Sequence, residues 1–150
     1  MNEPIFPGIK IYIRELQCPC CGQLPPNLYE DDFYLTSFQV WQAIRTEWGK
    51  PIPISKGGGY RCSKYQANLV LAGKTKACCS PHFFWALDND LDSAYECEEF
   101  VGLVDRRFPD LRIGYLKYIN LPKPKTFVHI DNAYLVIPRP MESWKEGVRW

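Results

Sequence analysis

The chain contains only two histidines, His82 and His129, and an aspartate follows each of them closely in the sequence. Neutral imidazole and carboxylate groups are both common zinc ligands, and a catalytic zinc site usually has three protein ligands and one position for water. His82, Asp88 and His129 match this set, so the sequence predicts one zinc ion bound by these residues. The spacing of the two histidines is equally compatible with side chains that are hydrogen-bonded in the core or at the surface.

A β-strand is predicted around His129, because the sequence there alternates with the period of two that is typical of strands. Successive side chains of a strand point to opposite faces of the sheet. Phe127, His129 and Asp131 would therefore share one face, and Val128 and Ile130 would pack on the other. This arrangement directs His129 into a cleft while its two neighbours stay buried.

The sequence leaves more than one choice for the carboxylate ligand near His82. A short apolar run precedes Asp88 and predicts a loop histidine followed by a strand aspartate. Asn89 is a poor zinc ligand, whereas Asp90 would share a strand face with Asp88. The acidic stretch that begins at Asp88 could also form a solvated turn before a helix that is capped by Ser93.

Longer elements must position these residues. Helices are predicted at residues 33–48 and 93–107, where apolar residues recur at spacings of three and four. Residues 63–71 could form a shorter helix before Gly73. Strands are predicted at residues 113–119, 127–131 and 134–137, with a tight turn at Asn132 and Ala133. No break in composition separates two domains. We therefore expect a single α+β domain over residues 1–150, with helices packed on a small antiparallel sheet.

The composition does not indicate a charged macromolecular partner. The 18 basic and 17 acidic residues nearly cancel, which argues against binding to nucleic acid or to an anionic membrane. No apolar run approaches the roughly 20 residues that a membrane helix needs, and the first residues lack the pattern of a signal peptide. We expect a protein made in the cytoplasm, without membrane insertion and of open oligomeric state.

The chain has seven cysteines, and an odd number cannot all pair within one molecule. A structural zinc site is one alternative use for them, because thiolates are good zinc ligands. Such a site would draw on Cys18, Cys20, Cys21, Cys78 and Cys79. Their spacing is irregular, and cysteines that pack as small apolar residues are the simpler interpretation.

Four short segments with chemically useful residues follow one another along the chain: Gly59-Tyr60-Arg61-Cys62, Ser80-Pro81-His82, Ala86-Leu87-Asp88 and Phe127-Val128-His129-Ile130-Asp131. Together and in this order, they resemble the zinc D-alanyl-D-alanine carboxypeptidase family, especially its phage and prophage branch. The segments at residues 15–22, 44–52 and 144–150 also resemble that branch, so the likeness covers most of the chain.

The resemblance implies a zinc metallopeptidase that hydrolyses peptidoglycan stem peptides, with the fold of the hedgehog signalling domain. His82, Asp88 and His129 would bind the zinc ion, and Arg61 would hold a carboxylate or carbonyl of the substrate. Ala86-Leu87-Asp88 keeps the local register of the family motif, which favours Asp88 over Asp90 as the ligand. A phage-encoded enzyme of this kind would act at the bacterial cell wall.

The sequence departs from the family pattern at two points. Trp85 stands where the family has a glycine, and the segment before Asp88 is one residue short. Active members also place an acidic residue or a histidine two or three positions before the last zinc ligand, where this chain has Phe127 and Thr126. Asp131 could act as the general base in their place, or it could orient a zinc ligand. The sequence therefore allows an active peptidase or a catalytically weak module that binds zinc or peptide, such as a phage structural component.

Overall fold

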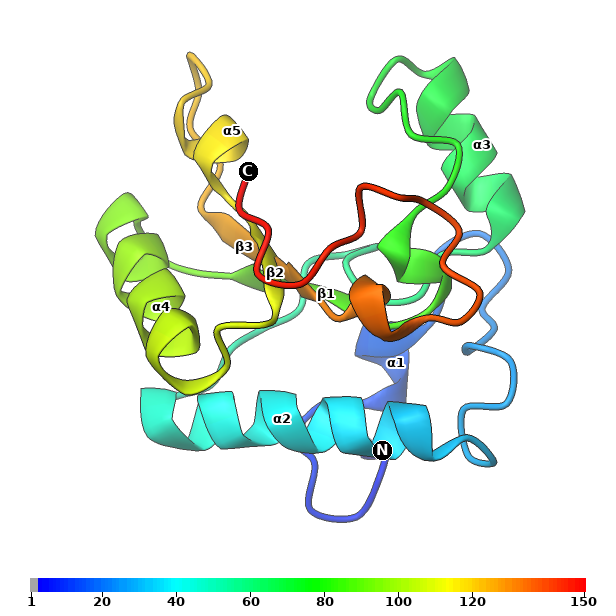
Figure 1. Cartoon of the computed structure of the whole chain (residues 1–150), viewed down its shortest axis with the longest axis horizontal. Helices are drawn as coiled ribbons and strands as arrows, with labels where there is room; N and C mark the ends of the chain where they lie inside the picture. The colour runs from blue at the N-terminus through cyan, green and yellow to red at the C-terminus, as the bar shows by residue number, and fades with distance from the viewer. Residues whose placement is uncertain (1–2) are drawn as a thin grey trace.

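The computed structural model describes residues 3–150, which form one α+β domain around a three-stranded antiparallel sheet. The strands are β1 (Ala86–Asp90), β2 (Arg112–Gly114) and β3 (Phe127–Asp131), and β3 lies between the other two. Figure 1 shows the sheet near the middle of the molecule, above helix α2 (Asp32–Trp48). Val128 and Ile130 of the central strand are fully buried. The alternation predicted around His129 is therefore confirmed, and the opposite face of β3 is left for polar residues.

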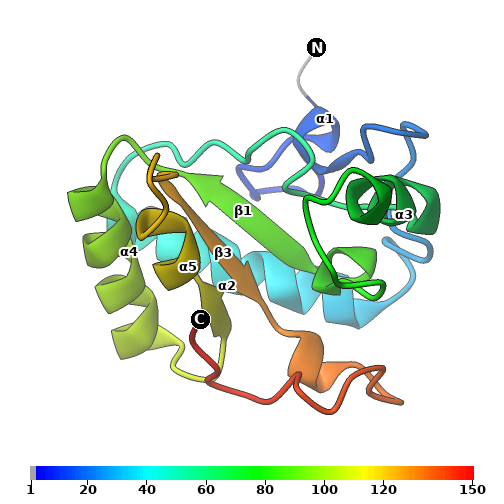
Figure 2. The same ribbon diagram turned by 90° about the horizontal axis from the view of Figure 1, so that it is seen from above.

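Two long helices cover the apolar face of the sheet. Helix α2 (Asp32–Trp48) begins at the capping side chain of Asp31 and ends at Gly49, whose left-handed backbone suits glycine. Helix α4 (Ala94–Arg107) begins at Ser93, whose hydroxyl accepts a hydrogen bond from the N–H of Glu96. Figure 2 shows α2 running beneath β1 and β3, with α4 beside one end of the sheet.

Shorter helical segments surround the polar face. They are α1 (Ile13–Leu16), α3 (Ser63–Leu71), η1 (Pro81–Phe83), α5 (Leu116–Ile119) and η2 (Ala133–Leu135). Helix α3 and α4 stand at opposite ends of the sheet in Figure 2. None of the described helices is long and apolar enough to cross a membrane.

The predicted helices at residues 33–48, 63–71 and 93–107 are confirmed to within a residue at either end. The prediction of a single α+β domain with a small antiparallel sheet is also confirmed. Periodicity succeeds for α2 and α4 because each has a buried apolar stripe and a capping side chain, Asp31 or Ser93. Helix α3 has no such stripe, since Gln66 is its one buried residue.

Two strand predictions are wrong. The strand expected at residues 113–119 ends at Gly114, because the N–H groups of Tyr115 and Leu116 donate to the carbonyl of Trp150 rather than to β3. Residues 134–137 form no strand with β3, and the turn at residues 132 and 133 leads into η2 instead. Asp131 causes this change of direction, since its Oδ1 accepts a hydrogen bond from the N–H of Ala133 at 2.9 Å.

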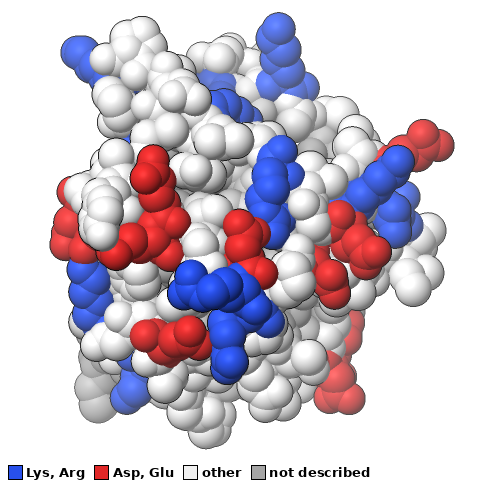
Figure 3. Space-filling view, turned by 60° about the vertical axis from the view of Figure 1, so that its left-hand side comes forward, with Lys and Arg blue, Asp and Glu red and all other residues white. Residues whose placement is uncertain are grey.

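The surface carries charges of both signs. On the face shown in Figure 3, lysines and arginines are interspersed with aspartates and glutamates. Arg149 contacts Asp105 at 2.6 Å and Arg107 contacts Glu47 at 2.9 Å. This face has no extended region of one charge, in keeping with a net charge of +1.

Candidate metal centre

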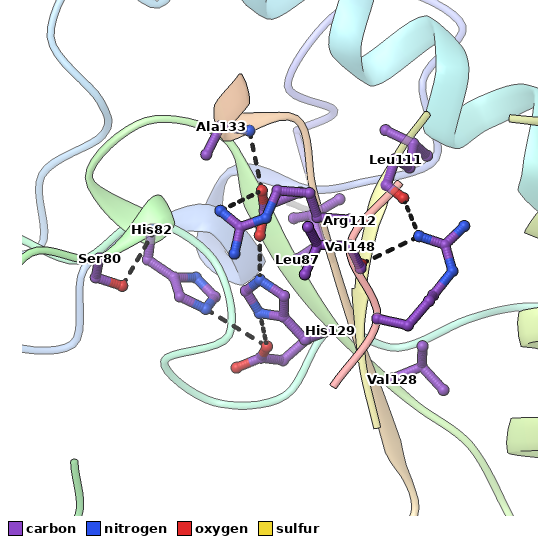
Figure 4. A network of polar contacts seen from close by, with 12 residues as sticks. Ser80, His82, Leu87, Leu111, Arg112, Val128, His129, Ala133 and Val148 are labelled. Atoms are coloured by element: carbon purple, nitrogen blue, oxygen red, sulfur yellow. Dashed lines mark hydrogen bonds and ion pairs between the residues drawn. The ribbon is translucent and has the colours of Figure 1, made fainter. Parts of the chain in front are cut away.

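The pairing of β1 with β3 places Asp88 directly opposite His129. Residues that face each other across an antiparallel pair project their side chains to the same side of the sheet. His82 joins them from η1, where the Ser80 hydroxyl accepts a hydrogen bond from its backbone N–H at 3.3 Å. The two imidazole rings lie 5.0 Å apart between their centres, and Figure 4 shows them side by side.

Three potential ligand atoms converge at this point. Oδ1 of Asp88 lies 3.4 Å from Nε2 of His82 and 2.8 Å from Nδ1 of His129. All three atoms lie within 4.8 Å of one another. Ligands at zinc-bond lengths around a tetrahedral ion are separated by about 3.3 Å. The three side chains therefore form a candidate metal-binding group, in which the Asp88–His82 distance is close to this value and the Asp88–His129 distance is shorter.

Both histidines have their other ring nitrogen held by an acceptor. Nδ1 of His82 lies 2.7 Å from the carbonyl oxygen of Gly59, and Nε2 of His129 lies 2.8 Å from Oδ2 of Asp131. A carbonyl oxygen can only accept, so Nδ1 of His82 carries a hydrogen and the neutral ring has its Nε2 available to a metal. Zinc-binding histidines commonly have such outer partners, which orient the ring and fix its tautomer.

The electrostatics of the two histidines differ. Burial alone would lower the pKa of His129, but its hydrogen bonds to Asp131 and Asp88 raise it to about 9. Burial lowers the pKa of His82, and the attraction of Asp88 offsets only part of this effect. Burial would raise the pKa of Asp88, yet the two imidazoles hold it well below its usual range. His82 and Asp88 are thus in their metal-binding protonation states at neutral pH.

Asp131 lies on the far side of the His129 ring from Asp88. Its side chain is fully buried, and both oxygens are engaged. Oδ2 faces Nε2 of His129, while Oδ1 accepts from Ala133 and lies 3.7 Å from Nη1 of Arg112. This position suits a residue that orients the imidazole.

Arg61 contacts the centre through Asp88. Its Nη2 donates to Oδ2 of Asp88 at 2.9 Å, and its Nε donates to the carbonyl of Gly57 at 2.7 Å. These bonds direct the other oxygen of Asp88 toward the histidines. The loop that carries Arg61 passes close to β1, and a Cβ on Gly58 would lie 2.7 Å from Cβ of Asp88. Only glycine permits this approach.

The side chains of Asn89 and Asp90, which follow Asp88 on β1, point away from the histidines. Asn89 points into the core, where its Nδ2 donates to the carbonyls of Leu87 and Val128 and its Oδ1 accepts from Trp41. Asp90 accepts a hydrogen bond from Ser55 at the exposed end of β1. Asp88 is therefore the carboxylate that meets both histidines, as the motif register predicts.

Trp85 is buried where the family pattern has glycine. Its indole packs edge-to-face on Phe38 of α2, with ring centres 6.1 Å apart. The large side chain thus serves the core beneath the sheet. The shortened segment still brings Asp88 to the histidines, because β1 begins at Ala86 directly after this tryptophan.

A cleft of about 210 Å³ contains the two histidines. Sequence reasoning did not identify several residues that line it: Arg112, Lys117, Tyr118, Trp144 and Trp150. The guanidinium of Arg112 lies over both indoles, 5.8 Å from the ring centre of Trp144 and 5.0 Å from that of Trp150. Of these residues, Arg112 could have been noticed in the sequence, because it is a charged residue at the start of the buried strand β2.

Gly114 makes room for the carboxyl-terminal tryptophan. It pairs with His129 across the sheet, and a Cβ at this position would lie 2.6 Å from the ring of Trp150. The indole therefore lies beside β3, with its ring centre 5.4 Å from that of His129 and its plane tilted by 53°. It forms one wall of the cleft.

The chain matches no protein-family model, and comparisons with curated proteins and with solved structures found no significant match. The interpretation of the site therefore depends on its own geometry and on the sequence motifs.

Proposed function

We propose that this chain is a zinc-dependent peptidase that hydrolyses peptidoglycan stem peptides, with His82, Asp88 and His129 as the metal ligands. The observation that carries the proposal is the convergence of Nε2 of His82, Nδ1 of His129 and Oδ1 of Asp88. The outward nitrogens of both rings are already held by acceptors, as zinc ligands require. The order of the motifs supports membership of the zinc D-alanyl-D-alanine carboxypeptidase family, with its hedgehog-like fold.

The chemistry of the bound metal suits peptide hydrolysis. A zinc ion with three protein ligands would supply an activated water, with a pKa near about 7, and would polarise the scissile carbonyl. His82, Asp88 and His129 account for three ligands and leave one position free. Peptide-bond hydrolysis at the bacterial cell wall is the reaction that the family resemblance then favours.

The charge of the cleft suits a substrate with a free carboxylate. Arg61, Arg112 and Lys117 line it, whereas Asp88 is the one acidic side chain among the described residues that line it. Nη1 of Arg61 makes no hydrogen bond within residues 3–150, so it is available to a substrate. A guanidinium recognises a carboxylate strongly, and the stem peptide ends in one.

Asp131 acts, in this proposal, by holding His129. It bonds to the ring nitrogen that points away from the ligand cluster, so the imidazole stands between Asp131 and the reacting atoms. The position of Asp131 favours orientation over proton transfer from the attacking water. The proton acceptor for that water is not assigned to a residue.

A second candidate function is a module that binds zinc and peptide with little or no turnover. The specific observation in its favour is the lack of a further carboxylate or histidine on the cleft wall among residues 3–150. Thr126 and Phe127 occupy the positions where active relatives in the family have a base. Loss of a general base costs about 10² to 10⁴ in rate.

Metal content and turnover test the proposal together. Purified wild type and His129→Ala would be analysed for zinc and then incubated with a stem peptide that ends in D-alanyl-D-alanine. We expect cleavage by the wild type, loss of cleavage in His129→Ala, and no change in the matched control Asp90→Asn. Zinc at the histidine site without cleavage of any stem peptide would favour the binding module. Cleavage that survives His129→Ala would overturn the site assignment.

A further inference from the structure

A second group of potential metal ligands lies outside the histidine site. The thiol sulfurs of Cys18, Cys21 and Cys62 lie within 4.8 Å of one another. Cys18 is buried, Cys62 is half-buried and Cys21 is exposed. The sequence alternative had combined the amino-terminal cysteines with Cys78 and Cys79, whereas the fold brings in Cys62 instead.

A tight turn places two of these thiols side by side. The N–H of Cys18 donates to the carbonyl of Gln23 at 2.9 Å, and the N–H of Gly22 donates to the carbonyl of Cys18 at 2.8 Å. Gly22 has a φ of 69°, in the left-handed region that glycine enters without strain. Cys18 and Cys21 thus have the Cys-x-x-Cys spacing of a zinc-binding turn, closed by a glycine.

The third thiol comes from the beginning of a helix. Cys62 is the N-cap of α3, and its Sγ accepts a hydrogen bond from the N–H of Tyr65 at 3.4 Å. The N–H of Cys62 in turn donates to Sγ of Cys18 at 3.3 Å. Helix N-termini and backbone N–H groups stabilise thiolates, which are the form of cysteine that binds metal.

Backbone N–H groups of three residues interact with the thiol of Cys18. Burial alone would raise the pKa of its thiol, but N–H groups of Cys62, Cys20 and Cys21 lower it to about 7. A structural cysteine in an apolar environment would have the opposite shift, as the fully buried Cys97 does. Geometry makes Cys18 a candidate ligand: its sulfur lies within 4.8 Å of the other two and accepts a hydrogen bond from the N–H of Cys62 at 3.3 Å.

We propose that Cys18, Cys21 and Cys62 bind a second zinc ion, with a structural role. Three thiols would release their protons to solvent, and three thiolates would bind the ion, as in structural zinc sites. Cys20, in the same turn as Cys18 and Cys21, interacts with Cys62 and is a candidate for the fourth position. The ammonium group of Lys64, also close to Cys20, would offset part of the negative charge of the thiolates.

The ion would join two segments that are far apart in sequence and adjacent to the histidine site. The N–H of Tyr60 already donates to the carbonyl of Leu16 at 2.8 Å, so the segments run together beside the cysteines. Cys62 directly follows Arg61, and Gly59 supplies the carbonyl that holds His82. A zinc ion here would stabilise the loop that supports the candidate centre.

Elemental analysis of the full chain, purified with a thiol reductant, would test this site independently of the proposed function. We expect about two zinc ions per chain in the wild type, since each group of ligands would hold one. We expect about one in Cys62→Ser, one in His129→Ala and none in the double variant. The matched control is Cys78→Ser, which removes an exposed cysteine outside the group and should keep both ions.

Cobalt substitution provides a second measurement. His129→Ala loaded with Co²⁺ should show the near-ultraviolet charge-transfer absorption of sulfur ligands, and addition of Cys62→Ser should remove it. Cys21→Ser serves as a milder variant if Cys62→Ser fails to fold, because Cys21 is exposed. Unchanged zinc content in both serine variants would overturn the proposal. So would a disulfide between Cys18 and Cys62 in wild type purified without reductant, whatever the outcome at the histidine site.

Discussion

Asp88 and His129 face each other across β1 and β3, with Oδ1 of Asp88 2.8 Å from Nδ1 of His129. The contact joins residues that are 41 positions apart in the sequence. The same carboxylate oxygen also faces Nε2 of His82 at 3.4 Å. One oxygen atom thus lies between both imidazoles, and the antiparallel register puts it there.

Asp88→Asn should weaken zinc binding at the histidine site. An amide is a poor zinc ligand, so the loss should exceed the roughly 10- to 100-fold cost of removing an outer partner. Competition with a coloured chelator would measure the affinity, in a Cys62→Ser background that isolates this site. Asp90→Asn is the control, because Asp90 bonds to Ser55 away from the histidines. Equal affinities in the two variants would contradict the assignment of Asp88.

Asp131→Asn should lower zinc affinity by about 10- to 100-fold, the usual cost of losing an outer partner of a zinc ligand. The amide keeps the shape of the side chain but weakens its hold on Nε2 of His129. Affinity and peptide cleavage at saturating zinc would both be measured. Unchanged affinity with cleavage reduced by about 10² or more would instead identify Asp131 as the general base.

The metal-free protein should lose stability as pH rises from about 6.5 to about 9. The pKa of His129 is 6.5 in the unfolded chain and about 9 in the folded protein, where burial opposes but Asp131 and Asp88 outweigh it. A group with a raised folded pKa contributes its full stabilisation below the unfolded pKa, and loses it as pH passes through the folded value.

Thermal unfolding in the presence of a chelator, compared between wild type and His129→Gln, would show this effect. The comparison is needed because Cys18 acts in the opposite direction. Its pKa is lowered from 9.0 to about 7 by backbone N–H groups that outweigh burial, so its contribution increases over part of the same range. A melting-temperature difference between the two proteins that does not shrink toward pH 9 would contradict the prediction.

Gly58→Ala should destabilise the protein and weaken zinc binding. The new Cβ would lie 2.7 Å from Cβ of Asp88 and 2.9 Å from the carbonyl oxygen of Ser55, so the loop or β1 must move. Overpacking of this kind costs about 1–3 kcal/mol. Chemical denaturation and zinc competition would measure the two effects.

Gly102→Ala is the matched control for that substitution. Gly102 lies in α4, and the nearest atom to an added Cβ is the flexible guanidinium of Arg106 at 3.6 Å. Alanine in a helix interior stabilises by about 0.5–1 kcal/mol relative to glycine. If Gly58→Ala and Gly102→Ala had the same stability and the same zinc affinity, the loop around Gly58 would not constrain Asp88.

The sequence by itself determined the helices and the strand whose patterns involve only residues a few positions apart. The helices at residues 33–48 and 93–107 follow from apolar periodicity and caps, and the strand around His129 follows from its alternation. The residue types of the candidate metal site were also visible, because the chain offers only two histidines. These features depend on residues a few positions apart.

The tertiary structure alone decided which of those residues meet. Alternation permits both Asp88 and Asp90 to share a face, but the register with β3 puts Asp88 opposite His129. The grouping of Cys62 with Cys18 and Cys21 likewise depends on how distant segments pack. The apolar run at residues 134–137 was misread as a strand because a short run without periodicity does not reveal its hydrogen-bond partners. Strand register and loop packing are set by long-range contacts, and no local pattern contains them.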